Sequence, residues 1–379
     1  MHQIVHHDYH LRHYFRNREI TELYISVAIK AFAKSMIGIF IPAYLWGLGF
    51  SIRGIAFFYI VYFFFVAVFV PFCFKAAAKW GIKHNMIAGL LISLVYIYLL
   101  YLVKYGFPFW IAAVIGALYV AYYWSGFHAD FARFTVKKET GKELGSIRFL
   151  SEMFSLAGPL AGALILTRFN FTVLMFIVGF FILLSILPLL ISRDRYAPYR
   201  FRFRDIFSER NTKYILSFEA TGIINVVAEM AWPLFIFISL HTYISLGAIV
   251  TVTSVLVAFL TLYIGQLADY LKTSKIVVAG STFHSLLWII RYFVSAAYSI
   301  FFVNLGSSIS YMMFDLPYNK FVYHRAIKEK NQTEFFIMRE WSMVVGRMVV
   351  LLFILFTESL FSGFVIAAFA SLLFLMFRK

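Results

Sequence analysis

The chain has 379 residues, of which 62% are hydrophobic and only 14% are charged. A soluble domain of this size cannot bury that much apolar surface, so the composition excludes an ordinary soluble enzyme, and disordered or fibrous proteins are excluded as well. The net charge of +16 does not indicate nucleic acid as a partner, because the basic residues lie in short blocks between long apolar runs, as in an inner-type membrane protein.

Several classes of site and topology are excluded by the residue content. Cys73 is the only cysteine, so there is no intramolecular disulfide and no Cys-x-x-Cys site. The first 20 residues are polar, and we expect no cleavable secretory signal. The apolar runs are continuous, which disfavours an outer-membrane barrel. No nucleotide-binding or HExxH fingerprint occurs, so we expect no cofactor, no metal site and no enzymatic activity.

A membrane-spanning helix needs about 20 mostly apolar residues. The chain contains twelve such segments with short connections between them, which predicts an all-α membrane protein with twelve transmembrane helices. The expected ranges are 22–45, 52–74, 85–103, 107–128, 147–167, 171–191, 213–239, 244–267, 275–297, 299–317, 335–357 and 360–377.

The basic residues predict the orientation. Of the 34 Lys and Arg residues, 27 fall in one set of loops and tails, while the opposite set holds only Arg53, Lys104 and Arg168. The positive-inside rule then places both termini in the cytoplasm of a cell (inner or plasma) membrane. We expect a cytoplasmic tail over 1–21 and a basic cytoplasmic linker over 192–212.

The linker separates an N-terminal half, 22–191, from a C-terminal half, 213–379, and residues recur between them. Pro42 and Pro233 lie 191 positions apart, as do Gly89 and Gly280. The pattern Glu152-x5-Gly158 returns 188 positions later as Glu340-x5-Gly346, and the segment 127–130 has a rough counterpart in 314–317. Several matches at nearly one offset predict two pseudo-symmetric six-helix halves.

With this pattern the chain resembles the major facilitator superfamily of secondary transporters. That family carries a GxLaDrxGrk signature between helices 2 and 3 and again between helices 8 and 9. The second copy stands here as Gly265-Gln-Leu-Ala-Asp269, whereas the first, over 74–83, has Ala78 in place of the acidic residue. The stretch Gly158-Pro159-Leu-Ala-Gly162 looks like the family's antiporter-associated helix 5 motif.

The resemblance implies gating roles. Asp269, with Gly265, would hold the start of helix 5 near Arg148, because a helix N-terminus attracts a carboxylate. The matching contact through Ala78 should be absent. Glu340 and Asp130 lie near cytoplasmic helix ends, where gating or charge pairing is expected.

Ionisable residues inside membrane helices are functional candidates, because a charge in hydrocarbon is costly. Lys30 and Lys34 are one turn apart on the first predicted helix, and Glu152 is at a depth comparable to that of Lys30. We expect a Lys30–Glu152 pair, either structural or functional, and a substrate role for Lys34.

The second half offers a carboxylate and a cation at similar depth. Glu229 follows Asn225 by four residues on the seventh predicted helix, and Arg347 is at the middle of the eleventh. We expect Glu229 and Arg347 to pair, with Glu229 either carrying protons or forming a static salt bridge. Arg291 is expected to be structural and to reach the outer interface.

The sequence therefore predicts a secondary transporter that moves a small anionic or zwitterionic organic solute by alternating access. Coupling to protons is expected, with export by antiport favoured by the helix 5 motif. The expected partners are the solute, protons and membrane lipids, and the expected state is a monomer. The alternatives are a lipid or lysolipid flippase of the same fold and a non-transporting sensor or partner subunit.

Overall fold

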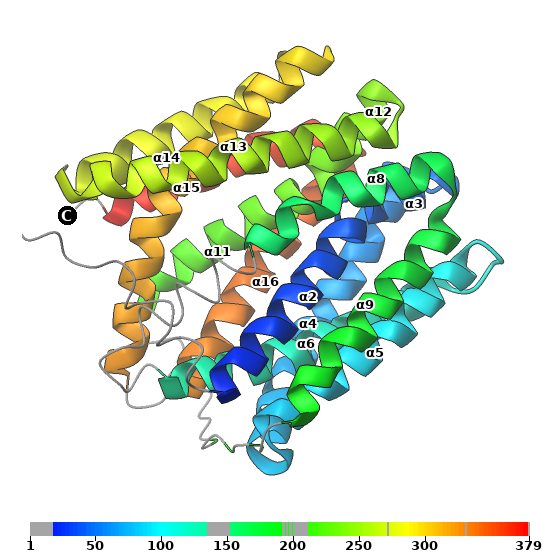
Figure 1. The fold of residues 1–379 in the computed structure, drawn as a ribbon. Helices are drawn as coiled ribbons and strands as arrows, with labels where there is room; N and C mark the ends of the chain where they lie inside the picture. The colour runs from blue at the N-terminus through cyan, green and yellow to red at the C-terminus, as the bar shows by residue number, and fades with distance from the viewer. Residues whose placement is uncertain are drawn as a thin grey trace, which may run out of the picture.

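The computed structural model is all-helical across the residues it describes, which are 18–134, 152–191, 194, 196, 199, 211–270, 273–329 and 332–377 (Figure 1). Its helices in chain order are α2 (Arg18–Gly38), α3 (Ile41–Gly47), α4 (Ile52–Trp80), α5 (Ile82–Val103), α6 (Phe109–Phe134), α8 (Gly158–Arg168), α9 (Phe171–Ile191), α11 (Thr212–Val226), the π-helix η2 (Val227–Ala231), α12 (Trp232–Leu240), α13 (Tyr243–Tyr270), α14 (Thr273–Ile290), the 3₁₀ helix η3 (Arg291–Phe293), α15 (Ala297–Lys328), α16 (Gln332–Thr357), α17 (Leu360–Leu372) and η4 (Leu373–Phe377). Within this described part, ten helical segments are long and apolar enough to cross a membrane, judged by length and composition.

Two predicted segments fall outside those ten. The segment 147–167 is described only from residue 152, and its main helix, α8, has 11 residues. The segment 299–317 lies in α15, which is 32 residues long but has a low mean hydropathy because it carries polar residues such as Asn304 and Asp315. Both predicted segments therefore overlap helices that composition alone does not mark as spans.

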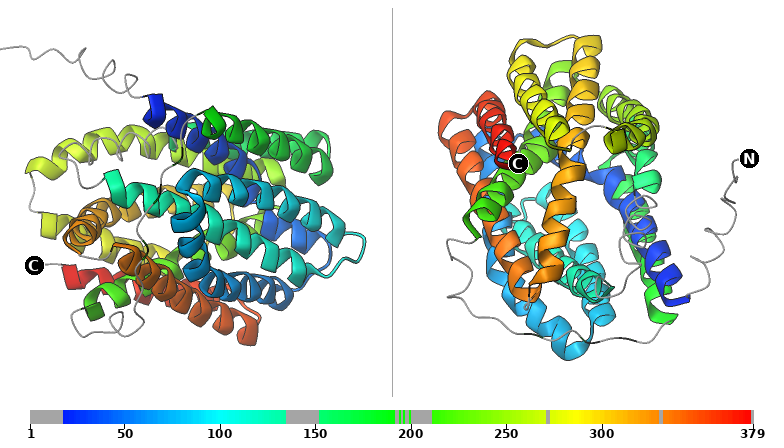
Figure 2. Two further views of the ribbon diagram at one scale, coloured as in Figure 1. Left: turned by 90° about the horizontal axis from the view of Figure 1, so that it is seen from below. Right: turned by 90° about the vertical axis from the view of Figure 1, so that its left-hand side faces the viewer.

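The first described helix begins, and the last one ends, toward the same end of the bundle, here called the terminal end. Figures 1 and 2 show that α2 begins there and that the chain returns there at its C-terminus. At the opposite end, α3 packs against α12. The long helices run between these two ends. The site described below therefore lies between the helix contacts at the terminal end and those at the opposite end.

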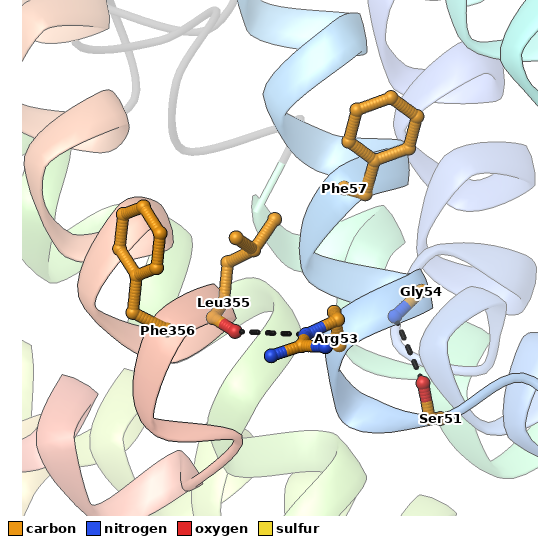
Figure 3. A pocket seen from close by; sticks show the side chains of 6 residues that line it. All are labelled: Ser51, Arg53, Gly54, Phe57, Leu355 and Phe356. Carbon is orange, nitrogen blue, oxygen red and sulfur yellow. Dashed lines mark hydrogen bonds between the residues drawn. The ribbon is translucent and has the colours of Figure 1, made fainter.

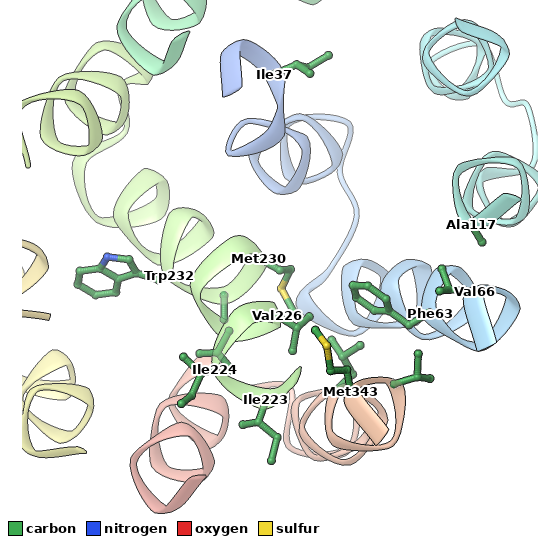
Figure 4. Packing of buried hydrophobic residues seen from close by; sticks show 14 of the residues in the cluster. Ile37, Phe63, Val66, Ala117, Ile223, Ile224, Val226, Met230, Trp232 and Met343 are labelled. Atoms are coloured by element: carbon green, nitrogen blue, oxygen red, sulfur yellow. The ribbon is translucent and has the colours of Figure 1, made fainter. Parts of the chain in front are cut away.

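Helices from the first part of the chain pack along helices from its last part. α4 packs against α16, and α8 packs against α13. In Figure 4, Val226 of α11 and Met230 of η2 face Phe63 of α4 and Met343 of α16. All four side chains are at least nine-tenths buried. These contacts bring η2 next to α4 and α16.

Glycines allow the closest helix contacts. A Cβ atom at Gly346 of α16 would lie 2.1 Å from the carbonyl oxygen of Glu219, and one at Gly222 of α11 would lie 2.1 Å from that of Met343. On the other side of the bundle, a Cβ at Gly162 of α8 would lie 2.0 Å from the carbonyl oxygen of Met36. Small residues of this kind let helix backbones approach closely, which is the main source of helix association in lipid.

Asp194, just after α9, caps the start of α5. Its carboxylate accepts hydrogen bonds from the backbone N–H groups of Lys83, at 2.8 Å, and His84, at 2.9 Å, and it also contacts the His84 ring. Gly81 has φ +106°, and a side chain there would collide with Asp194. A carboxylate at a helix N-terminus is favoured by the unpaired N–H groups and the helix dipole. The N-terminus of α5, close to Ala78 in the sequence, is therefore capped by an acidic residue of the linker region, Asp194.

Substituting Gly346 with Ala tests the α11–α16 contact. The added methyl group meets a backbone carbonyl that cannot rotate away, so we expect the free energy of unfolding to fall by about 1–3 kcal/mol. Thermal unfolding of the purified protein in detergent measures the change. Gly38→Ala is the matched control, because no atom lies within 4 Å of a Cβ at that position. Equal melting temperatures for the two variants would contradict the assignment.

Candidate functional site

Two oppositely charged side chains are exposed in the middle of membrane helices. Lys34 on α2 and Glu229 in η2 are both solvent-exposed, and Asn225 at the end of α11 is half-buried. The charge of Glu229 interacts with Tyr59 and Tyr62 of α4, so its exposed face is turned toward the bundle rather than toward lipid. In the part of the chain that the structure covers, neither Lys34 nor Glu229 makes a hydrogen bond or ion pair.

A proline sets the local backbone at Glu229. Pro233, near the start of α12, has no N–H to donate to the carbonyl of Glu229, four residues earlier. The chain forms a π turn here, and the N–H of Trp232 bonds back to the carbonyl of Val227. Single π turns inside α-helices are frequent at functional sites. The turn, Val227–Ala231, contains Glu229 and begins two residues after Asn225, so the backbone from Asn225 to Glu229 is not a regular α-helix as the spacing predicted.

Arg347 approaches Glu229 without pairing with it. Its guanidinium carbon lies 4.5 Å from the ring centroid of Phe63. Its charge interacts with two carboxylates, more strongly with Glu340 than with Glu229. Its Nε atom is buried and has no hydrogen-bond partner among the described residues. The predicted Glu229–Arg347 ion pair is therefore wrong for this conformation. The cation lies within electrostatic range of two carboxylates instead.

Lys30 is held by aromatic rings rather than by an acid. Its Nζ atom lies 3.6 Å from the ring centroid of Tyr123 and 5.1 Å from that of Trp124, both on α6. A desolvated ammonium over an aromatic face gains cation–π stabilisation. Glu152 is exposed at the start of the helical segment before α8. The predicted Lys30–Glu152 pair is therefore wrong, because the α6 aromatics occupy the position expected for the carboxylate.

Near the terminal end, Glu340 belongs to a buried polar cluster between α6 and α16. Its Oε1 atom lies 3.6 Å from Nε2 of His128 and 3.5 Å from Nη1 of Arg339. The same Arg339 nitrogen is 3.2 Å from His128 Nε2. The His128 ring also stacks on Phe336, with ring centroids 4.8 Å apart. The cluster joins α6 to α16 at the level where a gating contact was expected for Glu340.

At the opposite end, aromatic and polar contacts join helices from distant parts of the chain. The Tyr243 ring packs against Phe40, Phe171 and Phe237. The backbone N–H of Leu160 in α8 donates to the Thr251 hydroxyl of α13 at 3.0 Å. These contacts hold α3 and α8 against α12 and α13.

A shallow groove between α4 and α16 lies at this same end (Figure 3). Arg53 crosses it, donating to the Leu355 carbonyl at 3.4 Å and pairing with Glu358 at 2.9 Å. Phe57 and Phe356 form its apolar walls. Both charged partners are about half exposed, so the ion pair contributes little to stability, about 0–1 kcal/mol.

Several predicted gating residues lie outside what the structure describes. Arg148 falls in a segment that is not described. α6 and α13 contain the backbones of Asp130, Gly265 and Asp269, but the surroundings of these residues are outside the described set. The described part therefore brings Glu229, Asn225 and Arg347 to one region and Lys30 and Lys34 to another.

Sequence reasoning missed the tyrosines that surround these charges. Tyr59 and Tyr62 interact with Glu229, and Tyr123 holds Lys30. Their only sequence signal is helical spacing, with Tyr119 and Tyr123 four residues apart on one face. That signal is not specific in a chain with 24 Tyr residues.

Substituting Glu340 with Gln tests the cluster between α6 and α16. The change leaves the neighbouring arginines without their nearest carboxylate, so we expect a loss of about 3–5 kcal/mol of stability. His128→Gln should cost less. In a double-mutant cycle by thermal unfolding, the two changes should couple by about 0.5–3 kcal/mol. Strictly additive effects would show that the two side chains do not interact.

The comparisons agree on one family. The family model of the Major Facilitator Superfamily matches residues 23–331. No curated protein matches the chain in sequence. Among solved structures, a mutant of the nucleoside transporter NupG aligns with a TM-score of 0.71 at 13% identity, covering 96% of this chain and 99% of that one. Another NupG structure aligns with a TM-score of 0.66, also at 13% identity, covering 95% and 98%.

At such identities the structural likeness shows the fold alone, and the family model supplies the membership. The all-helical bundle, its apolar spans and its interior charges agree with both findings. The chain is a multi-pass membrane transporter, not an enzyme, and it belongs to the major facilitator superfamily.

Proposed function

We propose that the protein is a secondary active transporter that moves a small anionic or zwitterionic organic solute by alternating access, coupled to protons. The observation that carries the proposal is the pair of exposed interior charges, Lys34 and Glu229. An exposed ammonium and an exposed carboxylate without protein partners among the described residues can each bind a group of opposite charge on a solute. A charge without such a role would be expensive at this depth.

We propose twelve helices in two six-helix halves that rock against each other. Repeated contacts support the two halves: a Cβ at Gly89 would lie 2.8 Å from the backbone nitrogen of Tyr123, and one at Gly280 would lie 3.1 Å from that of Phe314. Gly280 lies 191 residues after Gly89, and Phe314 lies 191 residues after Tyr123. Equivalent helix crossings in two halves are the expected result of a parallel repeat.

Glu229 is the proposed proton carrier. Protonation would remove its attraction for Arg347, which also interacts with Glu340. Arg347 would then be held by Glu340 alone, and deprotonation would restore the competition between the two carboxylates. A carboxylate whose interaction with a cation changes between conformations binds a proton in one and releases it in the other.

The direction and setting of transport are part of the same proposal. We propose export by exchange for protons, a cell-membrane location with both termini in the cytoplasm, and a monomer. The basic loops support the orientation. The helix 5 glycines that suggest antiport also have a packing role, since Gly158 and Gly162 allow α8 to approach Ser35 and Met36 of α2.

Proton flux in proteoliposomes with an internal pH dye tests the coupling. The solute panel includes carboxylates, amino acids and nucleosides, because the structural neighbours named above are nucleoside transporters. We expect solute-dependent proton movement in the wild type and its loss in Glu229→Gln, while uptake of labelled solute down its own gradient persists. Lys34→Gln should raise KM about tenfold or more, because a charged hydrogen bond to the solute is lost.

Glu329→Gln is the matched control, since Glu329, directly after α15, pairs with Arg325 of that helix at 2.5 Å, away from the interior charges. Unchanged proton flux in Glu229→Gln would remove Glu229 as the carrier. Absence of flux with every solute, together with scrambling of a fluorescent lipid, would replace the proposal with a flippase.

A further inference from the structure

Arg291 is buried between two tryptophans at the start of η3. Only 3% of the residue is exposed, although the sequence placed it at the outer interface. Its guanidinium carbon lies 3.6 Å from the ring centroid of Trp288 and 4.2 Å from that of Trp232. The two indoles cover the faces of the guanidinium, so its N–H groups can find partners only in its own plane.

No protein partner fills that plane. The Nε and Nη1 atoms of Arg291 are fully covered and have no hydrogen-bond partner among the described residues. Within the same part of the chain, the guanidinium forms no ion pair. Arginine stays charged in proteins, and a buried charge without a counter-charge is strongly unfavourable. The aromatic faces compensate only part of that cost, since cation–π contacts contribute about 0.5–2 kcal/mol.

The surroundings supply further donors. The indole N–H of Trp288 and the hydroxyl of Ser307 are buried without partners in the described structure. α14 and α15 are antiparallel, with Leu287 beside Gly306 and His284 beside Tyr311. That register places Ser307 on α15 opposite Trp288, one turn from Arg291.

Asn304 adds to the excess of donors. Its side-chain oxygen accepts the indole N–H of Trp232 at 2.9 Å. An indole nitrogen is only a donor, so this bond fixes the orientation of the Asn304 amide. The NH₂ group of Asn304 then remains as a hydrogen-bond donor. The nearest buried histidine, His284, is already bonded to Ser371 through Nδ1 at 3.0 Å.

We propose that the space beside Arg291, Trp288, Ser307 and Asn304 is a binding site for a small monovalent anion of the chloride class. Its chemistry is that of an anion site: one buried positive charge beside buried N–H and O–H groups that have no partner among the described residues. One negative charge balances the single cation. The proposal does not depend on what the protein transports.

The test uses the purified full-length protein in detergent, exchanged into gluconate and titrated with bromide. We expect a saturable rise in melting temperature and a saturable quenching of tryptophan fluorescence with the same midpoint. In Arg291→Met the midpoint should weaken by at least about tenfold, because a charged hydrogen-bond donor is lost. Arg168→Met is the control: Arg168 ends α8, is exposed, and should leave the midpoint unchanged.

A second variant keeps the charge in place. Trp288→Phe retains an aromatic face but removes the indole N–H, so the bromide midpoint should shift several-fold even where Arg291→Met cannot be purified. Bromide anomalous density beside Arg291 in a crystal would locate the ion. A wild type without a saturable response means that only water fills the site, and equal midpoints in wild type and Trp288→Phe mean that bromide binds elsewhere. Either result overturns the proposal.

Discussion

A charged side chain inside a bilayer must be hydrated, paired or covered by polarisable groups, because hydrocarbon provides none of the solvation of water. The interior cations of this protein meet that requirement in different ways. Lys30 lies over Tyr123, and Arg347 lies over Phe63 within range of Glu340 and Glu229. Lys34 is exposed. Aromatic rings and carboxylates therefore compensate two of these cations within the protein, whereas Lys34 has no such partner among the described residues.

Close helix packing controls how far apart these charges are. Gly346 lies against the Glu219 carbonyl of α11, and Arg347 is the next residue along α16. The backbone contact at Gly346 therefore fixes the height of Arg347 relative to Glu229, ten residues after Glu219 on the same span. A larger residue at position 346 would separate the two helices and weaken an electrostatic interaction that falls with distance. Helix packing thus controls the electrostatic interaction between Arg347 and Glu229.

The sequence predicted the helix positions and the interior charges, since both depend on long apolar runs and on the polar residues that interrupt them. It did not predict which side chains surround each interior charge. Helical periodicity gives the face on which Lys30 lies but not which neighbouring helix meets that face, so Glu152 was as reasonable a partner as the aromatic side chains of Tyr123 and Trp124. Arg291 was placed near an interface by its depth, yet the side chain folds inward between two tryptophans.

Local backbone chemistry explains a further difference. Glu229 and Asn225 were expected on one face because four residues make about one α-helical turn. Pro233 cannot donate to the Glu229 carbonyl, and the chain instead widens into η2, which begins after Asn225 and contains Glu229. A proline in an apolar run predicts a disturbance of the helix but not its form, because a kink, a break and a π turn all remove the same hydrogen bond.

The π turn also links the two polar regions of the second half. Trp232 begins α12 directly after η2, its ring covers Arg291, and its indole N–H is tied to Asn304 of α15. Glu229 lies three residues earlier in the same wide turn. Single π turns inside α-helices are frequent at functional sites. Through Trp232, the turn that contains Glu229 is connected both to Asn304 of α15 and to the buried guanidinium of Arg291, so the interior carboxylate and the buried cation belong to one continuous set of contacts.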